Sequence, residues 1–159
     1  MEHLKLLFSL LLGIVCSIIL IPAFSVERPS ESPIGYWKTI DDVTGHAKSI
    51  VQIWKTEENV LMGKVIKVFS KEGETKRICT KCKGEMHNQP VVGMVIVSGL
   101  KSKEKQWSNG KILDPENGKT YSCAIRTLEN GKRLHVRGYT GLPLLGRSQT
   151  WERVDLMSG

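Results

Sequence analysis

The chain has almost no helical patterning. Beyond residue 34, no segment repeats its apolar residues at the i, i+3, i+4 spacing of an amphipathic helix. Apolar and aromatic residues instead form short runs bounded by turn residues, which is typical of strands. Internal repeats and low-complexity tracts are also missing. These absences argue against helical bundles, parallel α/β folds and repeat proteins, and they leave an all-β domain.

Familiar catalytic motifs are missing as well. Neither the Gly-x-Ser-x-Gly elbow of serine hydrolases nor the His-Glu-x-x-His motif of zinc proteases occurs. Residues 118–120 and 141–148 approach a phosphate-binding loop. The first lacks the upstream glycine, and the second has Arg147 where lysine is needed. Both are interpreted as turns, so we expect no enzymatic activity and no cofactor.

The basic residues are spread along the chain rather than clustered. The net charge is +7, yet lysine and arginine never form a run of four. Aromatic residues make up only 6% of the chain, and most of them fit a core, whereas single-stranded nucleic acids are bound by aromatic side chains interleaved with basic ones. We therefore expect solvated strand faces and no nucleic-acid partner.

The one long hydrophobic run lies at the start of the chain. Residues 6–21 are almost wholly apolar, Pro22 ends the run, and Ala23 and Ser25 are small residues at the positions that signal peptidase prefers. This predicts a signal peptide over residues 1–25 and a periplasmic or secreted protein, with no stable membrane span after cleavage. The alternative is an uncleaved membrane anchor. A polar, Pro-rich tether is predicted over 26–33, followed by one domain over 34–155.

Period-2 alternation predicts about eight short strands. They are expected near residues 36–40, 49–55, 60–69, 93–100, 107–113, 120–127, 133–139 and 147–153. Medium-sized side chains are expected to face inward; these are Val65, Val95, Val97, Ile112 and Ile125.

The turns between these strands favour hairpins. Asn-Gly occurs at 109–110, 117–118 and 130–131, and it satisfies the positive φ angles of tight hairpin turns at low cost. Such turns join neighbouring antiparallel strands. The expected fold is therefore a single antiparallel barrel or sandwich.

Three cysteines lie beyond the predicted signal peptide. Cys123 falls in an alternating apolar stretch and is expected to be buried, whereas Cys79 and Cys82 lie in a long charged loop over 70–90. A disulfide that staples this loop is one interpretation of the pair. A redox dithiol is a second, and a partial zinc site with His87 is a third. Zinc needs four ligands and no second Cys-x-x-Cys exists, so no metal is expected.

Both ends of the predicted domain resemble a known arrangement. Gly35-Tyr36-Trp37 opens the first strand, and the last strand ends with Trp151-Glu152-Arg153. This resembles lipocalins and related calycins, in which a tryptophan of the first strand closes one end of the barrel beneath an arginine from near the last strand. The resemblance implies closure by Gly35, Trp37 and Arg153, with Arg147 as the second choice for the arginine.

A closer resemblance covers nearly the whole predicted domain. The chain resembles the bacterial exported family of unknown function numbered 2147. The matching stretches are residues 35–37, 79–82, 90–94, 107–110, 114–115, 118–121, 134–141 and 145–151, of which 134–141 is the most specific. The resemblance implies an eight-stranded lipocalin-like barrel in the envelope or outside the cell, and it implies no particular activity.

The basic residues of the late strands suggest a ligand. Arg126 and Arg137, with Tyr139, could line the barrel mouth if the two arginines share a face, and guanidinium groups there would hold a carboxylate. An apolar or amphipathic molecule such as a fatty acid would then bind inside. The alternative is an outer face paired with Glu129 and Glu152. A packed barrel that uses the 70–90 loop as a contact surface, and a redox protein, remain the other hypotheses.

Overall fold

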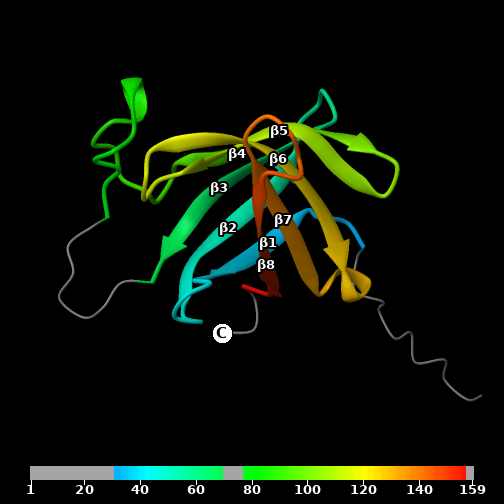
Figure 1. Ribbon diagram of the computed structural model, residues 1–159. Helices are drawn as coiled ribbons and strands as arrows, with labels where there is room; N and C mark the ends of the chain where they lie inside the picture. The colour runs from blue at the N-terminus through cyan, green and yellow to red at the C-terminus, as the bar shows by residue number, and fades with distance from the viewer. Residues whose placement is uncertain (1–30, 70–76, 157–159) are drawn as a thin grey trace, which may run out of the picture.

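The computed structural model describes residues 31–69 and 77–156, and their strands close into an antiparallel barrel (Figure 1). The strands are β1 (Gly35–Ile40), β2 (Ala47–Lys55), β3 (Val60–Val68), β4 (Val95–Lys103), β5 (Gln106–Asp114), β6 (Lys119–Leu128), β7 (Arg133–Tyr139) and β8 (Gly146–Val154). Each strand pairs with the next, and β8 pairs with β1, which leaves no open sheet edge. The eight-stranded lipocalin-like barrel predicted from the sequence is confirmed.

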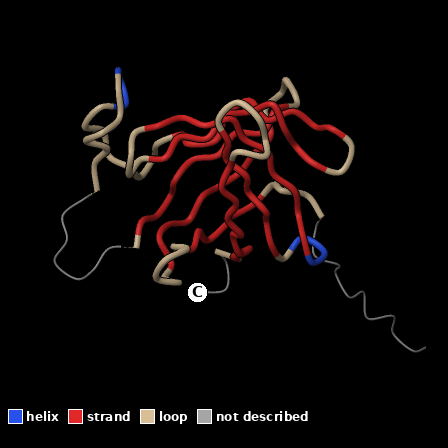
Figure 2. Tube along the Cα trace, in the orientation of Figure 1, coloured by secondary structure: helices blue, strands red, loops and turns tan. Residues whose placement is uncertain are grey.

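Strands account for most of the described residues (Figure 2). The helical parts of these residues are two single 3₁₀ turns, η1 (Gly84–Met86) and η2 (Glu129–Gly131). Within the described ranges, no helix has the length and apolar character needed to cross a membrane. The predicted signal peptide and residues 26–30 of the predicted tether lie outside the described residues.

The Asn-Gly pairs serve two structural purposes. Asn117-Gly118 and Asn130-Gly131 lie in the connections that follow β5 and β6, as predicted. Asn109-Gly110 is different, because it lies inside β5, where Asn109 has a φ of 61° and the register with β6 shifts. The prediction of a hairpin turn there is wrong: the pair forms a β-bulge, which also needs a residue at positive φ. The β4–β5 turn is formed by Glu104 and Lys105 instead.

The hydrophobic core fills the end of the barrel where β1 begins and β8 ends, called here the closed end. Its largest fully buried side chains belong to Trp37, Trp151, Ile53, Leu61, Leu100, Ile125 and Leu134. Burial of a large apolar side chain contributes roughly 1.5–3 kcal/mol relative to exposure. The closed end is therefore tightly packed. The opposite end, where β1 ends and β8 begins, is called here the open end.

The last residues of the predicted tether belong to the barrel. Pro33 is buried, and its carbonyl accepts a hydrogen bond of 2.8 Å from Trp37 Nε1. Thr127 donates to the carbonyl of Glu31 at 2.7 Å. Residues 31–33, assigned to the tether from the sequence, are thus part of the barrel's contacts, because the carbonyls of Glu31 and Pro33 pair with side chains of the closed end.

Candidate functional site

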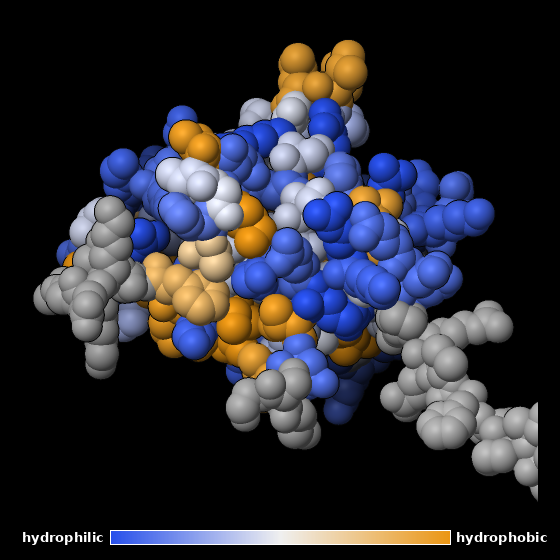
Figure 3. Space-filling model, turned by 90° about the horizontal axis from the view of Figure 1, so that it is seen from below, coloured by the Kyte–Doolittle hydropathy of each residue, from blue (hydrophilic) through white to orange (hydrophobic). Residues whose placement is uncertain are grey.

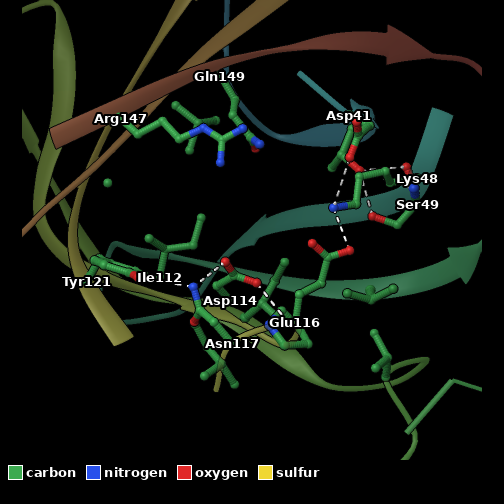
Figure 4. Close-up of a pocket in the computed structure, with 18 of the residues that line it drawn as sticks. Asp41, Lys48, Ser49, Ile112, Asp114, Glu116, Asn117, Tyr121, Arg147 and Gln149 are labelled. Carbon is green, nitrogen blue, oxygen red and sulfur yellow. Dashed lines mark hydrogen bonds and ion pairs between the residues drawn. The ribbon is translucent and has the colours of Figure 1, made fainter. Parts of the chain in front are cut away.

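A cavity of about 830 Å³ opens at the end of the barrel where β1, β3, β5 and β7 end (Figure 4). Its walls come from all eight strands and from the β3–β4 loop. The lining residues used below are Asp41, Lys48, Val65, Ile112, Asp114, Glu116, Asn117, Tyr121, Val136, Gly138, Tyr139, Arg147, Gln149 and Trp151. Small-molecule sites typically enclose roughly 300–1,000 Å³, so this hollow is large enough for a ligand.

The inner part of the cavity is apolar. Val65, Val136 and Trp151 are buried side chains that line it, and half-buried Ile112 adjoins them. Aliphatic and indole surface without charge favours apolar ligand groups over water. The inner part of the cavity therefore suits a hydrocarbon chain or ring.

The residues expected to face inward do so with one exception. Val65, Val97 and Ile125 are buried in the core, and Ile112 packs against it. Val95 instead lies half-buried beside a second hollow, and Ile96 lines the cavity. Strand alternation breaks near this point because the β3–β4 register shifts around Gly63.

Charged side chains surround the mouth, and Lys48 lies at their centre. Its Nζ is 2.6 Å from Glu116 Oε1 and 3.5 Å from Asp41 Oδ2 (Figure 4). Hydrogen bonds from the backbone and hydroxyl of Thr44 lower the pKa of Asp41 to about 2, and bonding from Val43 and the charge of Lys48 add to this effect. The mouth thus holds a lysine between two carboxylate side chains, those of Asp41 and Glu116.

A second polar group lies across the mouth on β5 and β6. The Asn117 side-chain amide donates to Asp114 Oδ2 at 2.8 Å and contacts the Tyr121 hydroxyl at 3.1 Å (Figure 4). This network fixes the lip formed by the β5–β6 turn and points a phenol toward the cavity. Hydrogen-bonding groups above an apolar interior are what an amphipathic ligand requires.

Arg147 belongs to this open end. It pairs with Asp42, which also accepts a hydrogen bond from Gln149 Nε2 at 3.2 Å. The second-choice assignment of Arg147 to barrel closure is therefore wrong. Arg147 lies six positions before Arg153 on β8, and at about 3.3 Å per residue the two are roughly 20 Å apart along the strand.

The ligand-binding role predicted for Arg126 and Arg137 needs correction. The two arginines share a face, but it is the outer one, since Ile125 and Val136 beside them are buried inside. Tyr139 does line the cavity. The sequence could have shown this, because strand alternation places Cys123, Ile125, Leu134 and Val136 on the inner face. The arginines between them must then lie on the outer face.

Arg137 has a different set of partners on the outer face. Its guanidinium donates to the carbonyls of Pro143 and Leu144, at 2.8 and 3.2 Å, and to the Ser148 hydroxyl at 2.9 Å. Burial, followed by the charges of Arg126 and Arg137, lowers the pKa of neighbouring His135. The predicted pairing of this face with acidic residues holds for Arg133, which lies 3.2 Å from Glu129. Glu152 pairs with Lys38.

The closed end carries the tryptophan and arginine that the sequence singled out. The guanidinium carbon of Arg153 lies 4.2 Å from the centre of the fully buried Trp37 ring, within cation–π distance. Arg153 also donates to the carbonyls of Ile34, Ser32 and Gly131. Gly35 has a φ of 135°, and a Cβ there would come within 2.6 Å of Arg153 Nη1. A glycine at position 35 therefore leaves the space that the guanidinium occupies.

Cys79 and Cys82 form a disulfide, which confirms the stapled loop. Both sulfurs are buried, and the loop carbonyl of Lys81 would lie 1.9 Å from a Cβ at Gly118. His87 Nδ1 lies 3.0 Å from the carbonyl of Cys82 rather than from a thiolate. Within the described ranges, no cluster of three or more potential metal ligands occurs. Cys123 is free and buried, and burial raises its pKa to about 12.

Closure at one end and a hollow at the other define the class of this protein as a lipocalin-like barrel. Residues 35–153 match a family described as uncharacterized protein conserved in bacteria (DUF2147), and the chain belongs to that family. Among curated proteins, none matches this sequence.

Among solved structures, the chain is similar to protein HP1028 from the human pathogen Helicobacter pylori, described as belonging to the lipocalin family. The two share 18% sequence identity with a TM-score of 0.68, over 80% of this chain and 86% of the other. At that identity the likeness shows the fold. The intramolecular disulfide is consistent with a location outside the cytoplasm.

Proposed function

We propose that this protein binds one elongated apolar or amphipathic molecule in the open half of its barrel, and that it acts by binding rather than by catalysis. The observation that carries this proposal is the cavity of about 830 Å³ between an apolar interior and a polar mouth. The apolar part of the ligand would lie against Val65, Val136 and Trp151. Its polar head would lie near Lys48 and Tyr121.

The charges at the mouth bear on the nature of the head group. Lys48, Arg77 and Arg147 line the mouth, and so do Asp41, Asp114 and Glu116, so the formal charges cancel. An acidic head group would exchange places with a carboxylate already paired to Lys48. A fatty acid and a neutral amphiphile are therefore both admissible ligands. The cavity therefore selects its ligand by the apolar part rather than by the charge of the head group.

Two other hypotheses have less support. A packed interaction module would need a filled barrel interior, whereas the open half is hollow. A redox protein would need an accessible dithiol, whereas Cys79 and Cys82 are joined and buried beneath the β5–β6 turn. Export through the predicted signal peptide would place the barrel in the envelope or outside the cell, where lipids and other amphiphiles occur.

A side chain added inside the cavity tests the proposal. A Cβ at Gly138, a lining residue, would lie 3.5 Å from Ile112 Cγ2 and 3.6 Å from Tyr121 Cβ, which are ordinary contacts. Gly138→Leu should therefore fold and fill the hollow. We expect a fluorescent fatty acid to bind the unchanged protein and to lose at least about tenfold in affinity for the variant, or roughly 1.4 kcal/mol.

The matched control is Ala124→Leu, which adds leucine on the adjacent strand with its side chain on the outer face. Its affinity should equal that of the unchanged protein. Equal binding to Gly138→Leu, or no binding to the unchanged chain, would remove the cavity as the site of function.

A further inference from the structure

We propose that the open end of the barrel docks on an anionic lipid surface through exposed apolar residues of two loops, from which the cavity takes its ligand. This inference rests on the proposed function, because it concerns how a ligand of that class reaches the cavity. Lipid docking is nevertheless a separate property, and it can be measured without any ligand in the barrel.

The most exposed large apolar side chains gather at this end. Val43 of the β1–β2 loop is 89% exposed, and Leu142, Leu144 and Leu145 of the β7–β8 loop are 68%, 85% and 70% exposed. We call these four residues the apolar rim. In Figure 3, apolar groups project from the upper edge beyond mostly hydrophilic neighbours, and a separate apolar area lies lower in that view. Exposed apolar groups of this size commonly mark an interaction site.

The loop that carries the three leucines is held in shape. Arg137, on the outer face of β7, donates to the carbonyls of Pro143 and Leu144 and to the Ser148 hydroxyl. Leu145 N also donates to the carbonyl of Leu142 at 3.0 Å. A loop fixed in this way presents its leucines without the entropic cost of ordering them on contact.

The two loops of the rim are joined to each other and to the cavity. Asp42, beside Val43, pairs with Arg147 and accepts a hydrogen bond from Gln149, both on β8. Val43 and Leu145 also line the cavity mouth. Insertion of the rim into a lipid surface would therefore place the mouth at the level where acyl chains begin.

Lysines beside the rim give the surface its charge preference. A second hollow of about 730 Å³ adjoins the cavity and contains Lys83, Lys111 and Lys119 without an acidic residue. None of these lysines forms an ion pair with another described residue. Tyr121 and Thr140 line both hollows, so the lysines lie at the same end as the rim. Unpaired lysines at a membrane-facing end favour anionic head groups.

The shape of the rim favours lipid over a protein partner. Its apolar groups lie on separate loops between charged side chains such as Arg147, and they do not form the continuous flat core of a protein interface. Leucine side chains on narrow loops can enter the head-group region singly while neighbouring lysines stay at its surface. A second copy of the chain is the competing occupant, and the experiment separates it.

A fluorophore on the rim tests the inference in the full chain. Cys123 is buried with a pKa raised to about 12, and Cys79 and Cys82 are joined, so a cysteine introduced at the surface is the reactive thiol among the described residues. In a Cys16→Ser background, an environment-sensitive dye is attached to Leu144→Cys. The matched control is Leu156→Cys, an exposed apolar position just after β8 at the closed end.

We expect the dye at position 144 to brighten severalfold with phosphatidylglycerol-containing vesicles, less with phosphatidylcholine alone, and the dye at 156 to stay unchanged. Leu142→Ser with Leu145→Ser should abolish most of the response. A silent dye at 144, an equal response at 156, or brightening that depends on protein concentration without vesicles would overturn the inference. Fatty-acid binding in vesicle-free buffer is measured in parallel, so failure of docking and failure of the cavity proposal are distinguishable.

Discussion

Single residues at the closed end decide whether the barrel holds its shape. Arg153 combines a ring contact with three donated hydrogen bonds to the carbonyls of residues 32, 34 and 131. Residues 32 and 34 precede β1, whereas residue 131 lies in the β6–β7 connection, far away in the sequence. One guanidinium on β8 thus holds both of these segments over a buried tryptophan. Burial lowers its pKa, which reflects this partly desolvated position.

Removal of that guanidinium should be costly. We expect Arg153→Ala to lower the free energy of unfolding by about 3 kcal/mol, because carbonyls at the closed end lose a charged donor and Trp37 loses its cover. Urea denaturation measures the change. Arg133→Ala removes an exposed pair with Glu129 and should cost less than about 1 kcal/mol. Similar losses in the two variants would contradict the role of Arg153.

The pH dependence of stability offers a second test at this scale. The pKa of Asp41 is about 2 in the fold, below its ordinary value of 3.8, so the ionised form is favoured in the native state. Its contribution is complete above about pH 4 and is lost as the pH falls toward 2. The difference in urea midpoint between the unchanged protein and Asp41→Ala should therefore shrink over that interval. A constant difference would contradict the assignment.

Among the elements, the β3–β4 loop is the least conventional. Cys79 N donates to the carbonyl of Gln89 and Asn88 N to that of Cys79, each at 2.9 Å, so the described part of the loop has its own hydrogen-bonded structure. The disulfide closes a tight turn within the loop, and the close approach of Lys81 to Gly118 holds that turn against the β5–β6 turn. The loop thereby becomes one wall of the cavity mouth rather than a free appendage.

Gly118→Ala should detach this loop. The backbone at 118 has a φ of 68°, and an added Cβ would overlap the carbonyl of Lys81. We expect faster amide hydrogen exchange over residues 79–91, together with roughly 1–2 kcal/mol of backbone strain. Gly99→Ala is the control, because its φ is also 68° but a Cβ would meet nothing within 4 Å. Equal exchange in the two variants would show that the loop does not depend on this contact.

Sequence patterning predicted the elements better than their connections. Alternation identified all eight strands, since one buried face imposes a period of two. Asn109-Gly110 misled because a bulge and a hairpin turn both require positive φ, and the choice between them depends on what the neighbouring strands pair with. The β4–β5 turn that does form has Glu104 at a φ of 55°. Glutamate rarely adopts a positive φ, so the sequence does not indicate a turn there.

At the scale of the whole molecule, the barrel has a packed half at its closed end and a hollow half at its open end. Trp37 and Arg153 were identifiable from the two ends of the domain. The cavity was not, because whether medium-sized inward side chains meet across a barrel depends on strand tilt and register. Lys48 was missed as a residue of the mouth for the same reason. It lies at the start of β2, and only the closed barrel brings it to Glu116.

The most direct measurement is native mass spectrometry of the protein purified from cells that make it. A barrel that binds one amphiphile should show a single small-molecule adduct that is lost on denaturation, and Gly138→Leu should lack it. Ala124→Leu should retain the adduct. An unadorned mass for the unchanged protein, together with no uptake of added fatty acid, would contradict a ligand-binding barrel.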